Sequence, residues 1–214
     1  MVWPIIFYGG ILCVWPILYY IAKLFNIFNI QHDLKKRSWI LSWIISILTS
    51  LYGIVFVLPK IIPMNSNEFM LFCLSESYAS KNLAWIFISF CLSDLMCGYI
   101  DYFNQIKFLE GWIHHTFYIC ILLVFLSLKM TNAFYAFLWC EIPTLIMSTG
   151  ILIPKLKFPF LFIFTFIMFR IIGYTYYALA FMFHCTWYVW IFSLPVALLI
   201  GGAHYFWIWK LLFK

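Results

Sequence analysis

Residues 91–118 read CLSDLMCGYIDYFNQIKFLEGWIHHTFY and contain much of the polar chemistry of an otherwise apolar chain. Asp94 lies inside one apolar run, a polar elbow follows at residues 104–110, and His114 and His115 open the next apolar run. Only 9% of the 214 residues are charged, whereas 66% are hydrophobic. Because about a quarter of the residues in soluble domains are charged, this composition predicts an integral membrane protein.

The apolar residues are grouped into stretches of the length that a membrane-spanning helix requires. Such a helix needs about 20 apolar residues. Seven stretches qualify, namely residues 2–25, 39–58, 83–103, 112–128, 133–153, 159–183 and 186–213. Pro59 is expected to end the second stretch and Pro154 the fifth, because proline interrupts helical hydrogen bonding. The sequence therefore predicts an all-α, polytopic membrane protein with seven transmembrane helices.

The basic residues between these stretches are unequally distributed. One side of the predicted bundle carries nine of them: Lys23, Lys35, Lys36, Arg37, Lys107, Lys155, Lys157, Lys210 and Lys214. The other side carries three: Lys60, Lys81 and Lys129. Cytosolic loops are enriched in lysine and arginine, so the C-terminus is predicted to be cytosolic and the N-terminus lumenal or external. We assign the net charge of +6 to this topology and expect no nucleic-acid partner.

Three ionisable residues lie well inside the predicted spans: Asp94, Glu141 and Arg170. A charged side chain in the membrane costs about 2.5–3.5 kcal/mol on insertion scales and usually faces the bundle interior or a cavity. Two interpretations are open. Arg170 pairs with Glu141 or Asp94 and fixes helix packing, or these residues form a pocket for a lipid headgroup or acyl carbonyl. Tyr118 shares a helix face with His114 and is included in the candidate lipid-binding site.

The histidine pair is the candidate catalytic centre, with Asp101 on the preceding helix. Imidazole acts as a general base or a nucleophile when a carboxylate orients it. Adjacent helical residues point about 100° apart, so only one of His114 and His115 is expected to face the bundle interior squarely. Five histidines without an HxxHH pattern do not suggest a metal site. No GxSxG or phosphate-binding loop occurs, and we expect no metal or cofactor.

Three segments together resemble the TLC domain family, which includes the ceramide synthases: LSDLMCGYIDYFNQIKFLEGWIHHTFY, WCEIPTLIMSTG and MFRIIGYTYYAL. The shared order is an aspartate-containing helix, a short loop, a helix that starts W-x-H-H, then E-x-P-T, then an arginine-bearing helix. It covers about residues 39–213. Ceramide synthases also carry a later aspartate pair. The corresponding region here has Glu141 as its only acid, so the chain is more similar to the non-synthase branch.

The resemblance implies an N-terminal transmembrane helix and basic cytosolic loop (residues 1–38) followed by a TLC domain (residues 39–214). The last six helices would form a bundle around a polar pocket open to the cytosolic side, in the endoplasmic reticulum membrane. The implied function is the binding of membrane lipids or acyl chains, with an influence on membrane lipid composition. The resemblance predicts neither an oligomeric state nor a particular lipid.

Two alternative functions remain open at the level of the sequence. In the first, the protein is an acyltransferase that takes an acyl group from acyl-CoA. His114 would carry this group to a lipid amine or hydroxyl, and Asp101 or His115 would orient a reacting group or remove a proton from it. In the second, the protein is a structural or chaperone-like partner of other membrane proteins, and its polar residues only lock the helices together.

Overall fold

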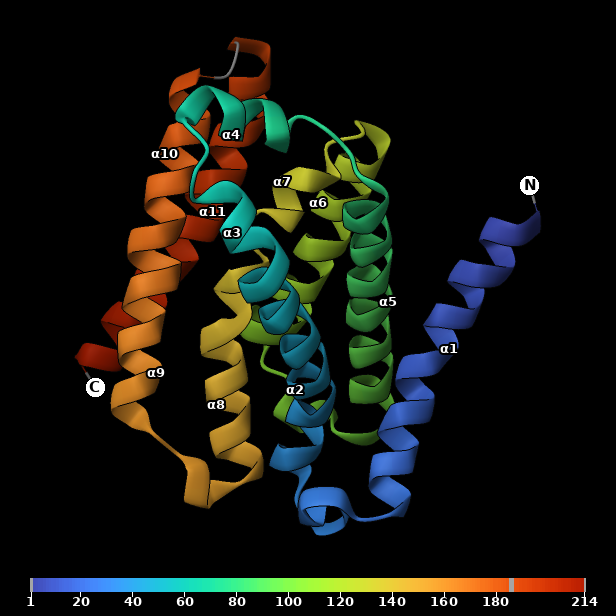
Figure 1. Cartoon of the computed structure of the whole chain (residues 1–214). Coiled ribbons are helices and arrows are strands. Elements are labelled where there is room, and N and C mark those ends of the chain that lie inside the picture. Colours follow the sequence, from blue (N-terminus) through green and yellow to red (C-terminus); the bar gives the residue numbers. More distant parts are fainter. Residues whose placement is uncertain (1, 185–186, 214) are drawn as a thin grey trace.

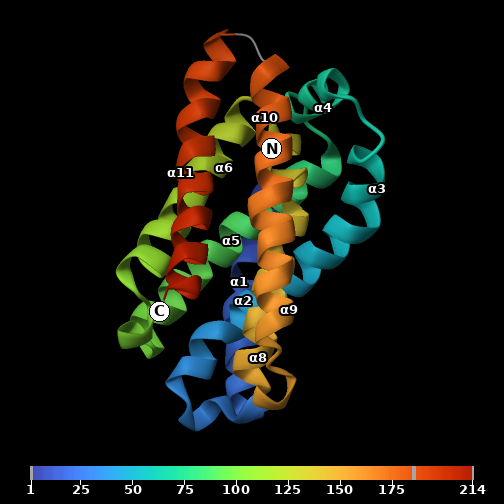
Figure 2. The ribbon, with the colours of Figure 1, turned by 90° about the vertical axis from the view of Figure 1, so that its left-hand side faces the viewer.

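The computed structural model describes residues 2–184 and 187–213, and every regular element within these ranges is a helix. Figure 1 shows long helices packed side by side, with α1 (Val2–Leu24) at one edge, where its N-terminal half diverges from the bundle. Figure 2 shows α10 (Tyr174–His184) and α11 (Trp187–Leu212) side by side. The prediction of an all-α fold is confirmed.

The remaining α-helices are α2 (Leu34–Tyr52), α3 (Leu58–Ile61), α4 (Ser66–Cys73), α5 (Tyr78–Asp101), α6 (His114–Ser127), α7 (Thr131–Tyr135), α8 (Ile142–Leu152) and α9 (Pro159–Thr165). Three π-helical turns interrupt or extend them: η2 (Gly53–Val57), η4 (Phe108–Ile113) and η7 (Phe166–Gly173). Four short 3₁₀ turns are η1 (Ile27–His32), η3 (Phe103–Gln105), η5 (Leu138–Glu141) and η6 (Pro154–Leu156). Each of the seven predicted stretches thus contains helix.

Four continuous helical segments are long and apolar enough to cross a membrane: Leu34–Ile61, Tyr78–Asp101, Phe108–Ser127 and Pro159–Phe183. Two further apolar helices, Gly10–Leu24 and Leu138–Leu152, are shorter. Within the described part of the chain, the protein is therefore an all-helical molecule with four candidate membrane-spanning helices.

Two predicted helix boundaries are wrong. Pro59 lies inside the continuous segment Leu34–Ile61 instead of ending it. The π turn η2 precedes this proline, and such a widened turn accommodates a break in the regular hydrogen-bond pattern. The predicted stretch 133–153 is divided, since α7 ends at Tyr135 and α8 begins at Ile142. Pro143 lies in the first turn of α8, where its missing N–H removes no helical hydrogen bond.

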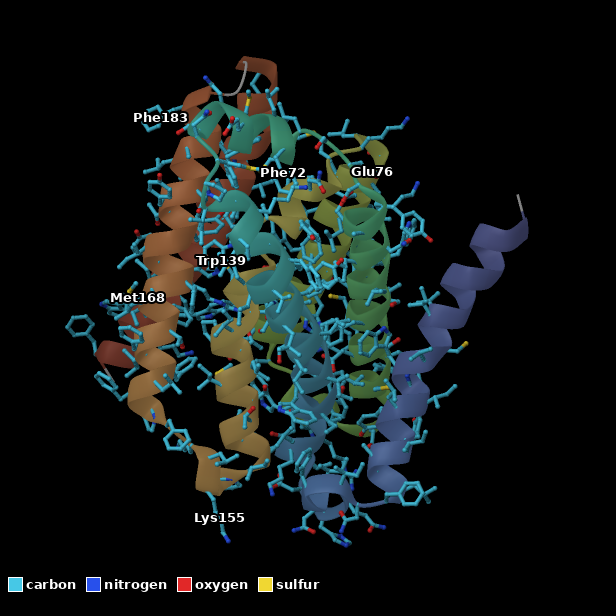
Figure 3. The ribbon with its side chains drawn as sticks, in the orientation of Figure 1. Phe72, Glu76, Trp139, Lys155, Met168 and Phe183 are labelled. Atoms are coloured by element: carbon cyan, nitrogen blue, oxygen red, sulfur yellow. The ribbon has the colours of Figure 1, made fainter. Side chains whose placement is uncertain are left out.

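The buried apolar side chains form two clusters. The first joins α1, α2, α5 and α6 and includes Trp15, Tyr19, Leu41, Phe87 and Leu122. The second joins the η2–α3 region, α4, η5 and α10 and includes Val57, Phe69, Trp139 and Tyr174. Figure 3 shows Trp139 in the interior of the bundle, where 1% of its surface is exposed. The candidate functional site lies beside this second cluster.

Gly53 allows η2 to approach η5 closely. A Cβ atom added at Gly53 would lie 2.6 Å from the backbone nitrogen of Trp139 and 2.9 Å from its Cα. Because backbone atoms cannot rotate away as a side chain can, Gly53→Ala is expected to destabilise the protein by about 1–3 kcal/mol. The measurement is the thermal unfolding midpoint in detergent micelles.

Gly202→Ala is the matched control for this prediction. A Cβ atom added at Gly202 would meet no atom within 4 Å. Alanine also favours a helix interior by roughly 0.5–1 kcal/mol over glycine, so the unfolding midpoint of this variant should be unchanged or higher. Equal midpoints for Gly53→Ala and Gly202→Ala would contradict the close approach of η2 and η5.

Candidate functional site

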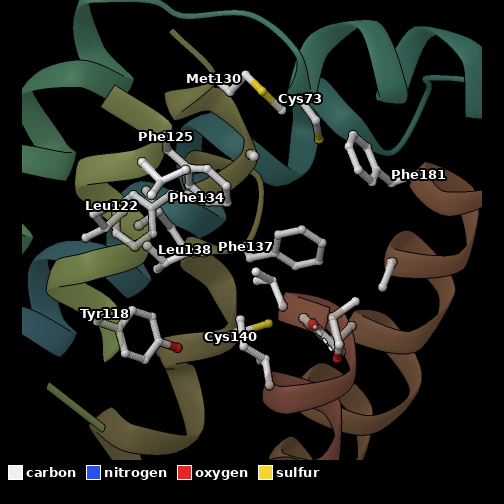
Figure 4. Close-up of a pocket in the computed structure, with 18 of the residues that line it drawn as sticks. Cys73, Tyr118, Leu122, Phe125, Met130, Phe134, Phe137, Leu138, Cys140 and Phe181 are labelled. Carbon is white, nitrogen blue, oxygen red and sulfur yellow. Dashed lines mark hydrogen bonds between the residues drawn. The ribbon is translucent and has the colours of Figure 1, made fainter. Parts of the chain in front are cut away.

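A cavity of about 530 Å³ lies among α6, η5, η7, α10 and α11. Most of the side chains that line it are apolar, including Leu122, Phe125, Phe134, Leu138 and Phe181, which are labelled in Figure 4. The lining also includes five polar or ionisable side chains and two thiols: Tyr118, Glu141, Arg170, Tyr174, His204, Cys73 and Cys140. The pocket is thus an apolar space with a small number of polar groups.

The cavity occupies one half of the bundle. On α6 the lining starts at Tyr118 and runs toward the C-terminal end of the helix. It continues past that end to Leu128 and Met130, on either side of Lys129. Figure 4 shows Met130 and Cys73 at one end of the cavity, and Tyr118 and Cys140 toward the other. The sequence predicted a polar pocket open to the cytosolic side. Of the residues assigned to it, Tyr118, Glu141 and Arg170 line this cavity and Asp94 does not, and the lining is mainly apolar and extends away from the Lys107 end.

The Cys73 thiol lies at the end of α4, outside the candidate membrane-spanning segments, and only 1% of the residue is exposed. Burial raises the pKa of this thiol well above its ordinary value, because the charged thiolate loses its hydration. Cys73 therefore contributes an uncharged, weakly reactive surface to the cavity.

Arg170 is held by several partners in the π turn η7. Its Nε donates to the Cys140 carbonyl oxygen at 2.8 Å, and its Nη2 donates to Thr144 Oγ1 at 2.6 Å. The same Nη2 lies 3.3 Å from Glu141 Oε1, and the two side chains are 11% and 19% exposed. Of the two acids that the sequence offered as partners of Arg170, the structure selects Glu141. The pair brings no net charge to the cavity.

His204 and Trp207, both on α11, belong to the same site and were missed as functional residues by the sequence. His204 Nδ1 lies 3.0 Å from the Arg170 carbonyl oxygen. The Trp207 ring lies 5.9 Å from the Arg170 guanidinium carbon and 5.7 Å from the His114 ring, measured to ring centroids. Trp207 thus connects the arginine to the histidine pair. No sequence signal identified it among eleven tryptophans.

The buried carboxylate beside the histidine pair is that of Asp94. His115 Nδ1 lies 3.3 Å from Asp94 Oδ2, with the two side chains 11% and 7% exposed. Tyr102 donates a hydrogen bond of 2.7 Å to the other oxygen, Asp94 Oδ1. His115 Nδ1 makes no well-aligned hydrogen bond to any residue that the structure describes. This polar contact joins α5 to α6.

The two histidines face different neighbours, as the 100° rotation between adjacent helical positions requires. His115 faces α5, where its ring also lies 5.5 Å from the Phe90 ring. His114 faces the Tyr118 ring at 4.8 Å and the Trp207 ring of α11. Neither histidine lines the cavity, but His114 contacts Tyr118, which does. Both are packed between helices, so the expectation that only one would face the interior is too strict.

Asp101 belongs to a separate group at the end of α5. It accepts hydrogen bonds from Lys23 Nζ at 2.9 Å, from Arg37 Nη1 at 3.0 Å and from the Tyr19 hydroxyl. These contacts join α1, α2 and α5 at the connection between α1 and α2. Within the described residues Asp101 forms no ion pair with His114 or His115, and the carboxylate that contacts His115 is that of Asp94.

Glu110, in the polar elbow, joins α11 to the start of α6. Its carboxylate lies 2.7 Å from Lys107 Nζ and 3.2 Å from Lys210 Nζ. Trp207, which contacts His114, lies less than one helical turn before Lys210 on α11. The C-terminal part of α11 is thus fixed to the residues that open α6 by one ionic contact and one aromatic contact.

These contacts give the site a defined chemical character. The cavity can bury an apolar chain, and its Tyr118, Glu141, Arg170 and His204 side chains can form hydrogen bonds to a polar group. Among the side chains of the described residues, no three histidine, cysteine, aspartate or glutamate residues come together in a way that could hold a metal ion. The sequence matches no protein-family model, no curated protein and no solved structure.

Proposed function

We propose that this protein is an integral membrane protein that binds a lipid or acyl chain in the cavity and thereby influences membrane lipid composition. The observation that carries the proposal is the cavity itself, about 530 Å³ in volume and lined mainly by apolar side chains. Small-molecule sites commonly measure about 300–1,000 Å³, with mostly apolar walls and a few placed polar groups. An acyl chain with one polar end has the matching character.

The proposal includes seven membrane crossings, in which α1, the α7–α8 region and α11 join the four candidate spans. Nine basic residues at one side against three at the other support a cytosolic C-terminus and a lumenal N-terminus. The endoplasmic reticulum is the membrane that the TLC resemblance implies.

Contacts between the resembling segments support the relationship to TLC domains. The aspartate-bearing and W-x-H-H segments meet through Asp94 and His115. The E-x-P-T and arginine-bearing segments meet through Glu141 and Arg170. Residues that are far apart in the sequence but belong to one pattern are therefore neighbours in space, as expected when they serve one site.

Acyl transfer is a second candidate, favoured by the pairing of Asp94 with His115. In this reaction an imidazole nitrogen attacks an acyl thioester, the thiolate of coenzyme A leaves, and the acyl group then passes to a lipid amine or hydroxyl. His114 contacts Tyr118 at the cavity, but the contacts with a carboxylate belong to His115. We therefore rank non-covalent binding first.

Filling the cavity is expected to abolish lipid retention. Ala178 lines the cavity, whereas its neighbour Leu179 is 48% exposed. Ala178→Phe should reduce the lipid that co-purifies with the protein by at least about tenfold, because the added ring occupies the binding volume. Leu179→Phe adds a ring of the same kind on the outer face and should retain the wild-type amount. Native mass spectrometry measures the bound lipid.

Denaturing mass spectrometry of the same samples separates the two candidate functions. Non-covalent binding predicts that the lipid mass is lost on denaturation. An acyl mass that survives denaturation and disappears in His114→Ala would instead establish acyl transfer through that residue. Equal lipid retention by Ala178→Phe, Leu179→Phe and the wild type would place the bound lipid outside the cavity and contradict the proposal.

A further inference from the structure

His204 is a polar residue in the wall of the cavity. It lies on α11, is 5% exposed and lines the cavity. Its ring is enclosed by aromatic neighbours, with the Tyr174 ring at 5.1 Å and the Phe166 and Trp207 rings at 6.2 Å. A polar ring held among aromatic side chains at a cavity wall has a fixed orientation.

The backbone of η7 fixes the protonation pattern of this ring. His204 Nδ1 lies 3.0 Å from the carbonyl oxygen of Arg170. A carbonyl oxygen only accepts hydrogen bonds, so Nδ1 carries the proton. In the neutral imidazole the other nitrogen, Nε2, is then an acceptor. Among the side chains that the structure describes, none forms a hydrogen bond with Nε2. Nε2 is also not one of the fully buried atoms that lack a partner, so it is accessible to a ligand in the cavity that His204 lines.

We propose that His204 Nε2 accepts a hydrogen bond from the bound lipid, so the cavity selects an uncharged lipid that carries a hydroxyl or an amide N–H. This inference rests on the proposed function, because it assigns the polar end of the lipid bound in the cavity. A ligand that covers this acceptor without supplying a donor leaves it without a hydrogen bond. A ligand that supplies the donor is therefore preferred over one of the same size that lacks it.

The other polar groups of the cavity agree with this class of ligand. Glu141 and Arg170 neutralise each other, so an ionised carboxylate would bring an unbalanced charge into an apolar space. The Tyr118 hydroxyl points into the cavity in Figure 4 and makes no hydrogen bond to the described residues. A lipid hydroxyl can donate to an imidazole nitrogen and can also accept from a tyrosine hydroxyl, whereas an ester can only accept.

Three ligands with one hydrocarbon chain test the inference: oleyl alcohol, methyl oleate and oleate. Binding of tritiated oleyl alcohol to the purified protein is measured in detergent by scintillation proximity, with each ligand as competitor. We expect oleyl alcohol to compete about tenfold better than methyl oleate or oleate, as one additional hydrogen bond to the ligand predicts. In His204→Phe, oleyl alcohol should lose this advantage while the affinity for methyl oleate stays unchanged.

The neighbouring residue provides the control. Tyr205 is 50% exposed and does not line the cavity, so Tyr205→Phe should keep the full preference for oleyl alcohol. His204→Gln, whose amide supplies both a donor and an acceptor, should keep part of it. His204→Gln replaces His204→Phe in the binding test if the phenylalanine variant does not fold, since phenylalanine leaves the Arg170 carbonyl without its donor.

The outcomes separate this inference from the proposed function. If wild-type protein binds oleyl alcohol and methyl oleate equally, the assignment of His204 is overturned while lipid binding stands. If none of the three ligands binds, or if Ala178→Phe binds them as well as the wild type does, the proposed function fails and the inference fails with it. An unchanged preference in a folded His204→Gln and a folded His204→Phe also overturns the assignment.

Discussion

Arg170→Leu is expected to destabilise the protein by about 3–5 kcal/mol, the usual cost of removing one partner from a buried ion pair. The change leaves the Glu141 carboxylate, 19% exposed, without its guanidinium. It also removes the donors that satisfy the Cys140 carbonyl oxygen and Thr144 Oγ1. The measurement is the free energy of unfolding from denaturant titration in detergent micelles.

The double variant Arg170→Leu/Glu141→Leu tests whether the lost energy comes from the unpaired charge. Replacing both members of a buried pair by apolar residues is often neutral or stabilising, so the double variant should recover most of the loss. Glu141→Gln, which keeps an acceptor for Arg170, should lose less than Arg170→Leu. If the single and double variants were equally unstable, the role of Arg170 would be its contacts with Cys140 and Thr144.

The same variants separate stability from binding. The double variant keeps an apolar lining, so it should still retain a lipid if the cavity provides most of the binding energy. Loss of the lipid from a folded double variant would mean that the Arg170–Glu141 pair contacts the ligand directly. The pair then has two roles, one in helix packing and one in recognition.

The helices could be predicted from the sequence because a bilayer demands long apolar stretches of a known length. The two boundary errors have local causes. At Pro59 a π turn allows the helix to continue, and hydropathy does not detect such a turn. In the predicted stretch 133–153 the helix ends at Tyr135, before the segment Leu138–Leu152 begins, and apolar residues on both sides concealed this break.

Parts of the site were predictable and parts were not. Charged residues are so rare in this chain that Arg170 had few possible partners, and Glu141 was one of them. Asp101 and Asp94 were harder to separate, since positions seven apart share a helix face. Only the packing of α1 beside the end of α5 shows that Asp101 pairs with Lys23 and that Asp94 is the acid near His115.

The apolar lining of the cavity could not be predicted, and neither could the place of His204 in it. In a membrane protein, apolar side chains that face lipid, fill a core or line a cavity have the same composition, so periodicity does not separate them. His204 stands alone in an apolar run, where a single histidine usually has a packing role. Its importance comes from the Arg170 carbonyl oxygen, 34 residues earlier in the sequence.

Asp101→Ala is expected to cost about 3 kcal/mol of stability, because it leaves two cations without their shared carboxylate. Lys23 and Arg37 are 29% and 13% exposed and lie 2.9 and 3.0 Å from Asp101 Oδ1. Arg37 also donates to the Ile30 carbonyl oxygen at 2.8 Å. The variant should therefore loosen the connection between α1 and α2, and trypsin should cleave after Arg37 faster than in the wild type.

The connection between α1 and α2 contains strained backbone, so it depends on the contacts that Asp101 provides. Asn26, Phe28 and Asn29 have φ angles of 49°, 58° and 59°. A left-handed conformation costs a residue such as phenylalanine roughly 1–2 kcal/mol, so the surrounding contacts must hold it in place. Asp101→Asn keeps an acceptor for Tyr19 and Lys23 but loses the charge, and should show an intermediate loss of stability.

A surface pair supplies the comparison that decides the role of Asp101. Lys107 is 68% exposed in its pair with Glu110, so Lys107→Ala should change stability by less than about 1 kcal/mol. If Asp101 serves structure, Asp101→Ala will lower stability and increase cleavage while the folded fraction binds lipid with wild-type affinity. If stability is unchanged and a lipid-modifying activity is lost, Asp101 is catalytic, as the sequence alone suggested.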